Sequence, residues 1–77
     1  MAMTLRELAV GETGCVVGFN KSSRGYRHKL LAMGLTPGTD FTVTRYAPLG
    51  DPVEIRVRGF ALSLRKDEAD ALLVERK

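Results

Sequence analysis

Apolar residues alternate with polar ones along several short stretches of the chain, which is the pattern of half-buried β-strands. The clearest case covers residues 53–64, where two alternating runs are joined by Gly59. A glycine at that point permits a tight reversal, so the two runs predict an antiparallel hairpin. In all, the pattern predicts five short strands, at residues 13–19, 41–46, 53–57, 60–64 and 73–75.

Between the first two strands the apolar spacing changes to that of a helix. Tyr26, Leu30 and Met33 recur at spacings of four and three, which places them on one helical face toward the core. The serines at 22–23 are candidate N-caps, so several starting points are open. Gly34 fits the left-handed residue that ends a helix, because glycine adopts a positive φ without steric cost.

Three further local signals complete the predicted framework. Thr4 and Glu7 match a capping box and predict a short N-terminal helical turn. Pro37 and Gly38, in the middle of residues 36–39, are typical of a type II turn. Asp67 is a candidate cap for a helical turn at residues 68–72.

The first strand contains an irregular signal. Cys15, Val17 and Phe19 share one face, which we expect to point inward. Gly14 and Gly18 lie on the other face and indicate a bend or a close backbone approach. Curling short strands into a barrel removes exposed edges. The sequence therefore predicts a mainly β fold, a single domain of residues 1–77 forming a small SH3-like β-barrel with short helical insertions.

Composition indicates the cellular compartment in which the protein is expected. The chain has 77 residues, 44% of them hydrophobic, and a net charge of +3. Its one cysteine, Cys15, has no partner for an intramolecular disulfide, which favours a reducing compartment. The N-terminus lacks the apolar run of a signal peptide, and no stretch approaches the ~20 apolar residues of a membrane span. We expect a cytoplasmic protein, with peripheral attachment at the inner face of the inner membrane as a variant.

The residue types do not indicate a metal site, a catalytic site or a phosphate-binding loop. One histidine, His28, has no carboxylate at helical spacing, and Cys15 is expected in the core, so we predict no metal site in the monomer. Ser22, Ser23 and Ser63 have no patterned base, and no glycine-rich phosphate loop precedes a helix. We therefore expect no catalytic residues, no cofactor and no enzyme activity.

The order of motifs resembles the FeoA family, the small cytoplasmic proteins of bacterial ferrous iron transport. The resemblance covers nearly the whole chain and is most specific where the helix–Gly–Leu–x–Pro–Gly element is followed by Ala–Pro–Leu–Gly–Asp–Pro. The matching segments are residues 18–20, 27–38, 45–53, 57–59 and 61–65.

This resemblance implies an SH3-like fold and a regulatory or assembly role beside FeoB, the membrane GTPase that moves ferrous iron, through its cytosolic part. Transition-metal binding is a family association that the residues do not predict in the monomer. The resemblance implies no catalysis, and it does not settle whether the protein alters GTP hydrolysis, gating or assembly.

We expect partner binding through the 47–52 loop, the helix before Gly34 and two basic clusters. Leu49 is either exposed or tucked inward, and Leu31 is either a buried second side of the helix or a sticky exposed one, with burial slightly favoured. The clusters contain Lys21, Arg24, Arg27 and Lys29, and Arg56, Arg58, Arg65 and Lys66. The candidate partner-binding residues are Arg24, Arg27, Lys29, Leu31, Pro48, Leu49, Asp51, Arg56 and Arg58.

Two other functions compete with this one. The basic balance and SH3-like shape also suit a small nucleic-acid-binding domain. Against it, Phe19, Phe41 and Phe60 are expected on apolar strand faces and not on a stacking platform. The other alternative is an accessory SH3-like domain of an iron-dependent regulator, which would need another chain to supply DNA-reading and metal-binding residues.

Overall fold

The computed structural model describes residues 3–20 and 24–77, with the side chain of Arg24 left out. The predicted caps at Ser22 and Ser23 lie outside these residues. Along the described chain the elements are β1 (Met3–Thr4), the 3-10 turn η1 (Leu5–Glu7), β2 (Thr13–Phe19), α1 (Arg24–Ala32), β3 (Asp40–Tyr46), the 3-10 turn η2 (Pro48–Gly50), β4 (Val53–Val57), β5 (Phe60–Leu64), α2 (Lys66–Ala71) and β6 (Leu72–Arg76).

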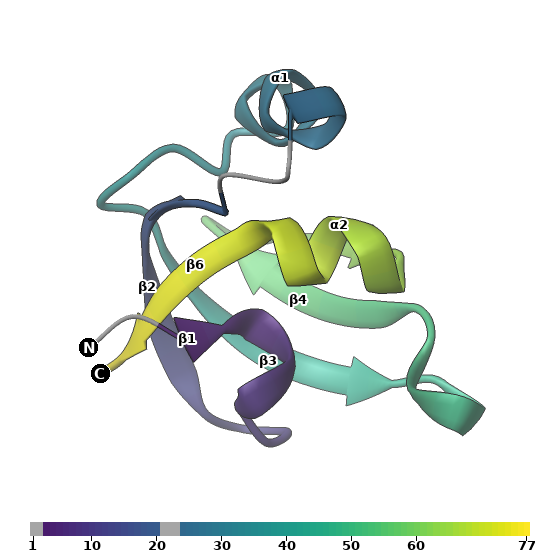
Figure 1. Ribbon diagram of the computed structural model, residues 1–77. Helices are drawn as coiled ribbons and strands as arrows, with labels where there is room; N and C mark the ends of the chain where they lie inside the picture. Colours follow the sequence, from purple (N-terminus) through teal and green to yellow (C-terminus); the bar gives the residue numbers. More distant parts are fainter. Residues whose placement is uncertain (1–2, 21–23) are drawn as a thin grey trace.

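The described strands form one antiparallel sheet in the order β1-β6-β2-β3-β4-β5. The mainly β prediction and its five strands are confirmed. A sixth strand, β1, was missed because two residues carry no readable alternation; Met3 pairs with Val74 and brings the chain ends together (Figure 1). The sheet is open over the described residues, with β1 and β5 at its edges, so closure into a barrel stays a prediction.

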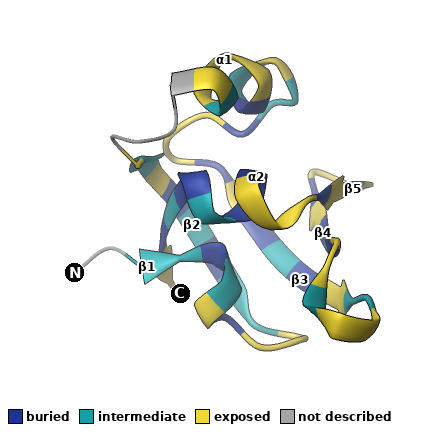
Figure 2. Cartoon of the chain, turned by 45° about the vertical axis from the view of Figure 1, so that its right-hand side comes forward, coloured by how far each residue is buried: buried dark blue, intermediate teal, exposed yellow. Residues whose placement is uncertain are grey.

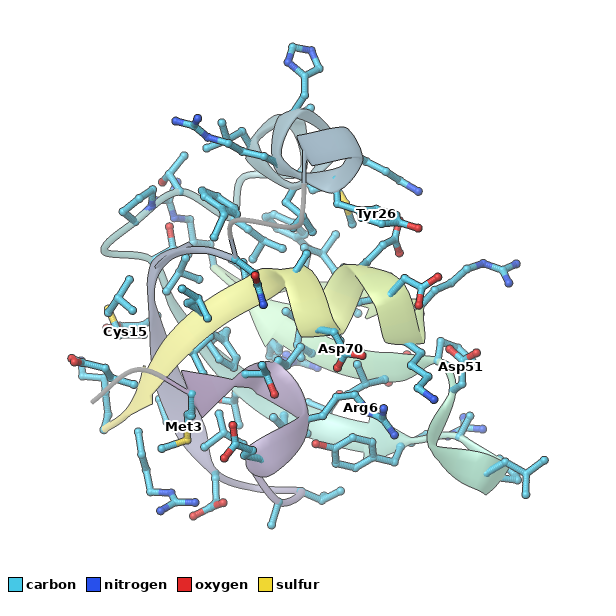
Figure 3. All side chains as sticks on the ribbon, viewed as in Figure 1. Met3, Arg6, Cys15, Tyr26, Asp51 and Asp70 are labelled. Carbon is cyan, nitrogen blue, oxygen red and sulfur yellow. The ribbon has the colours of Figure 1, made fainter. Side chains whose placement is uncertain are left out.

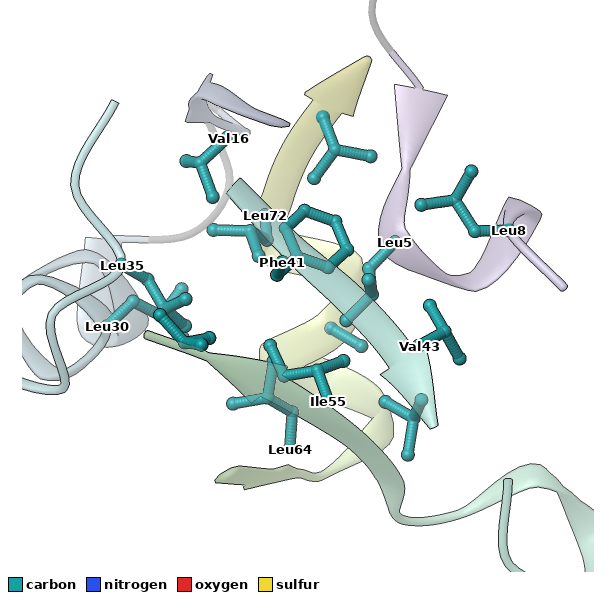
Figure 4. Close-up of a cluster of buried hydrophobic side chains, with 14 of the residues drawn as sticks. Leu5, Leu8, Val16, Leu30, Leu35, Phe41, Val43, Ile55, Leu64 and Leu72 are labelled. Carbon is teal, nitrogen blue, oxygen red and sulfur yellow. The ribbon is translucent and has the colours of Figure 1, made fainter. Parts of the chain in front are cut away.

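One apolar core lies inside the bent sheet (Figure 4). Strand residues from β2 to β6 meet there with leucines from η1, α1 and the turn after α1. The largest fully buried side chains are Leu5, Leu8, Val16, Leu30, Leu35, Phe41, Val43, Val53, Ile55, Val57, Leu64 and Leu72. The predicted helix face is confirmed, because Leu30 is buried and Tyr26 and Met33 pack against the core.

The predicted inward face of β2 is wrong for Cys15 and Val17, whereas Phe19 packs against the core as predicted. Gly14 and Val16 are buried, whereas Cys15 is half-buried and Val17 is exposed. The reason is a close approach, as the glycines indicated: a Cβ on Gly14 would lie 2.8 Å from the Phe41 ring. The ring occupies the space that a side chain would need, so the glycine side of the strand faces the core. Further along the strand, the pairing of β2 with β6 shifts register between Val16 and Gly18.

The end of α1 forms as its sequence predicts. Gly34 has a φ of +92°, its amide donates to the Leu31 carbonyl, and the Leu35 amide donates to the Leu30 carbonyl. These two bonds define a Schellman motif, and its characteristic apolar contact is made by Leu30 and Leu35, both fully buried. Gly38 then takes a positive φ in the turn leading to β3.

Candidate docking surface

The loop between β3 and β4 presents Leu49 to solvent. Its side chain is 101% exposed, so the exposed alternative for Leu49 holds. The backbone there is tightly closed: the Gly50 amide donates to the Ala47 carbonyl, and the Ala47 amide donates to the Pro52 carbonyl. Within this closure Leu49 has a φ of 71°, in the left-handed region that favours glycine. The loop therefore carries an apolar side chain outward in an unfavourable backbone conformation.

Asp51 joins this loop to α2. Its carboxylate accepts the backbone amide of Lys66 at 2.9 Å, at the first turn of the helix (Figure 3). The predicted cap at Asp67 is wrong, since Arg65 is the N-cap and its amide donates to the Glu68 carboxylate at 2.9 Å. Acidic groups favour the N-terminal end of a helix, because free amides point toward them. Asp51 thus fixes the loop against the fold.

A hollow of about 330 Å³ lies beside the loop, between α1, α2 and β5. It brings together Lys29 and Asp51, which the sequence proposed as partner-binding residues without placing them side by side. Pro52 and Arg65 belong to the loop and the basic cluster proposed for partner binding, whereas Ser63 and Glu68 were not proposed. The hollow is lined by Lys29, Asp51, Pro52, Ser63, Arg65 and Glu68.

Glu68 is the buried charge in this hollow, and it is paired. Its carboxylate contacts the Lys29 ammonium and accepts the Arg65 amide. Burial acts to raise the pKa of Glu68, but Lys29 and the Arg65 amide outweigh burial and hold that pKa below its ordinary value. The salt bridge links α1 to α2, so these carboxylate oxygens serve the fold and are already occupied.

A smaller hollow of about 180 Å³ shares Pro52 and Ser63 with the first. Its other wall residues are Arg45, Ala47 and Glu54, from β3, the loop and β4. The loop and β5 therefore border both depressions. Ser63 was missed because its sequence neighbourhood reads as an ordinary alternating strand.

The hairpin of β4 and β5 carries the second basic cluster. Arg56 and Arg58 are exposed, and among the described residues neither has an ion-pair partner. Phe60, assigned to an apolar strand face by alternation, is 47% exposed because it follows the turn at the edge of the sheet. The hairpin thus combines unpaired positive charge with a partly exposed ring.

The candidate partner-binding residues on α1 do not all lie at the same surface. Lys29 lines the larger hollow, but Arg27 and Leu31 line neither hollow. The Arg27 guanidinium lies 6.0 Å from the centre of the Phe19 ring, and Leu31 is half-buried. The side chain of Arg24 lies outside the description. The structure thus gathers Lys29, Asp51 and the loop, and leaves Arg27 and Leu31 apart from them.

Cys15 lies on the outer side of the sheet (Figure 3), and the charges of Asp40 and Lys77 act on its thiol. Partial burial raises the pKa of the Cys15 thiol, and the neighbouring Asp40 carboxylate raises it further. Asp40 is itself paired with the Lys77 ammonium at 2.8 Å, which lowers the pKa of Asp40. A thiol held protonated is a poor nucleophile and metal ligand.

No group of three or more His, Cys, Asp or Glu side chains that could hold a metal ion is found in residues 3–20 and 24–77. Over the same residues, no helix has the length and apolar character needed to cross a membrane.

Comparisons with known proteins identify relatives. The model of the FeoA domain matches residues 3–76. A curated relative, the Fe(2+) transport protein A/Fe(2+) transporter FeoB fusion protein of Porphyromonas gingivalis, is 38% identical over 74 residues; the match covers 95% of this chain and 8% of that protein.

Solved structures agree with this match. The FeoA-like protein from Clostridium acetobutylicum is 39% identical with a TM-score of 0.88, covering 97% of this chain and 86% of the other. A FeoA crystal structure described as an iron uptake regulatory protein is 32% identical with a TM-score of 0.83, covering 100% and 99%.

A likeness to a manganese-dependent transcriptional repressor concerns the fold alone. It has a TM-score of 0.88 at 16% identity and covers 99% of this chain and 37% of the repressor. The predicted SH3-like fold is confirmed by the FeoA structures. On the family match across residues 3–76, this chain belongs to the FeoA domain family.

Proposed function

We propose that this protein is a non-catalytic accessory module of ferrous iron uptake that binds the cytosolic GTPase part of a FeoB-type transporter. The supporting observation is the fusion protein, in which a segment 38% identical to this chain is joined to a FeoB transporter. Fusion holds two modules at high effective concentration, which is useful when separate chains must otherwise find each other. A cytoplasmic location follows from this role.

The surface proposed for docking is the loop around Leu49 with its two neighbouring hollows. Leu49 offers a whole exposed side chain, and Pro48 and Asp51 hold the loop in shape. An apolar anchor projecting from a fixed loop loses little conformational entropy on binding, so its burial translates well into affinity. Lys29, which lines the larger hollow, supplies a polar contact at the margin.

The test is a titration of this protein against the soluble cytosolic GTPase domain of FeoB from the same organism. It is run without nucleotide, with GDP and with a non-hydrolysable GTP analogue, each at low and high salt. We expect saturable binding in at least one nucleotide state. Leu49→Ser weakens that binding by about tenfold or more, because burying a leucine contributes about 1.5–3 kcal/mol.

Val10→Ser is the matched control. Val10 is another exposed apolar residue in a loop, at 57% exposure, and it lines neither hollow. It should leave the affinity unchanged. Absence of binding in every nucleotide state, followed by absence of binding to full-length FeoB, refutes the proposed function. Equal weakening by both variants refutes the assignment of the docking surface to the Leu49 loop.

A further inference from the structure

The β5 strand is an edge of the sheet. It is paired with β4 on one side, and within the described residues no strand pairs with its other side (Figure 2). An unpaired edge presents a row of amides and carbonyls that another strand can satisfy. The open side of β5 is therefore a ready-made site for backbone pairing.

The geometry of the hairpin shows which groups are free. Arg58 and Gly59 form its two-residue turn, both with positive φ, so Val57 and Phe60 are the hydrogen-bonded pair next to the turn. Hydrogen-bonded and non-bonded pairs alternate along an antiparallel ladder. The amides of Phe60, Leu62 and Leu64 therefore point to β4, whereas those of Ala61 and Ser63 point to the open edge.

This edge lacks the devices that normally protect one. The five residues of β5 contain no lysine, no proline and no charge, and its register with β4 shows no bulge. The opposite edge, β1, is only two residues long in the described chain, which limits pairing there. The two ends of the sheet thus differ in their readiness to accept a strand.

The two faces of the edge define what an added strand would carry. On the inner face Phe60 is 47% exposed and Leu62 is half-buried, so apolar side chains beside them would complete the core. On the outer face Ala61 and Ser63 are small; Arg56 stands opposite Ala61, and Glu54 stands opposite Ser63. Because strands lie about 4.8 Å apart, the long Arg56 side chain would reach over Ala61 to a carboxylate on an added strand.

We propose that the open edge of β5 accepts an extended segment of a partner protein, with apolar side chains on one face and an acidic side chain beside Ala61 on the other. The identity of that partner as FeoB rests on the proposed function. The charge argues against a second copy of this chain. Antiparallel pairing of two β5 strands would bring the Arg58 end of one copy beside the Arg65 end of the other.

Amide hydrogen exchange of the complex with the FeoB cytosolic domain tests this pairing residue by residue. In the free protein, the amides of Ala61 and Ser63 exchange rapidly, and those of Phe60 and Leu62 are protected by β4. At saturation, exchange at Ala61 and Ser63 slows by about tenfold or more. Phe60 and Leu62 are internal controls in the same strand.

A matched pair of variants tests the hydrogen bond itself. Ala61→Pro removes an amide that points outward, so the hairpin ladder is kept, and prolines are tolerated at such edge positions. Ala61→Val keeps the amide and favours the strand. We expect Ala61→Pro to weaken binding by about tenfold or more and Ala61→Val to retain it. A fold check by heteronuclear NMR accompanies both.

Every outcome decides the proposal. Binding to FeoB without slower exchange at Ala61 and Ser63 overturns the edge pairing and leaves the proposed function standing. If FeoB does not bind, short synthetic peptides of alternating valine and glutamate, or of valine and lysine, serve as probes. Protection of Ala61 by the acidic peptide alone supports the proposal. Protection by neither peptide, by both or by the lysine peptide alone, or protection that grows with the concentration of the free protein, overturns it.

Discussion

Leu35 and Leu49 have similar sequence surroundings and opposite places in the fold. Each lies in a turn with a proline and a glycine close by, Leu35 two residues before Pro37 and Leu49 directly after Pro48. Leu35 is fully buried, and its amide closes the end of α1 on the Leu30 carbonyl. Leu49 is fully exposed and has a φ of 71°.

The two turns differ in which residue takes the left-handed backbone conformation. In the first turn the left-handed position is filled by Gly34, which adopts it without strain. In the second turn one left-handed position is filled by Leu49, at a conformational cost of about 1–2 kcal/mol. Burial of its own side chain does not offset that cost, and this observation supports the docking role proposed for Leu49.

The two turns should differ most in how much stability the protein loses when the leucine of each is truncated to alanine. Leu35→Ala should lower the free energy of unfolding by about 2–5 kcal/mol, because it leaves a cavity in a closed core. Leu49→Ala should change it by less than about 0.5 kcal/mol. Urea unfolding followed by circular dichroism measures both. Similar losses for the two variants would contradict the comparison.

The first turn could be predicted from sequence because its determinants are neighbours in the chain. Gly34, Leu35 and the Pro37–Gly38 pair each act within a few residues, through backbone conformation and local hydrogen bonds. The β4–β5 hairpin is of the same kind. Its strands alternate in character and its glycine lies between them, so their register follows from local geometry.

The inward face of β2 and the composition of the docking surface depend on distant residues, and sequence alone did not reveal them. Phe41 and Leu8 fill the space above Gly14, and this turns toward the core the face of the strand that the alternation had assigned to the outside. The larger hollow joins Lys29 to Asp51 across α1, α2 and the loop. The sequence named those two residues, but their proximity is set by tertiary packing.

A smaller effect concerns the left-handed positions themselves. Gly34→Ala should destabilise the protein by about 1 kcal/mol. No atom lies within 4 Å of the added Cβ, so the loss is conformational and not a clash. Leu49→Gly should stabilise it by about 0.5 kcal/mol, since relief of the positive φ exceeds the added entropy of the unfolded chain. Thermal and urea unfolding give both values; a loss of stability in Leu49→Gly would show that Leu49 serves the fold.

The last prediction concerns the salt bridge between Lys29 and Glu68, which links α1 to α2. The pKa of Glu68 is lowered in the folded protein, so its ionised form contributes stability above its unfolded pKa of about 4.3, and this contribution is lost as the pH falls through the folded pKa. Glu68→Gln should therefore cost up to about 1 kcal/mol at pH 7 and progressively less in acid.

Unfolding by urea from pH 7 down to pH 3 measures this dependence. Glu75→Gln is the control, because Glu75 is exposed and forms no ion pair among the described residues. Its difference from the parent should stay small at every pH. A Glu68→Gln difference that does not change with pH would mean that shape and the Arg65 amide bond, and not the charge beside Lys29, account for the contribution of Glu68. The proposed docking surface would then border a hollow whose wall is held by packing and by that hydrogen bond.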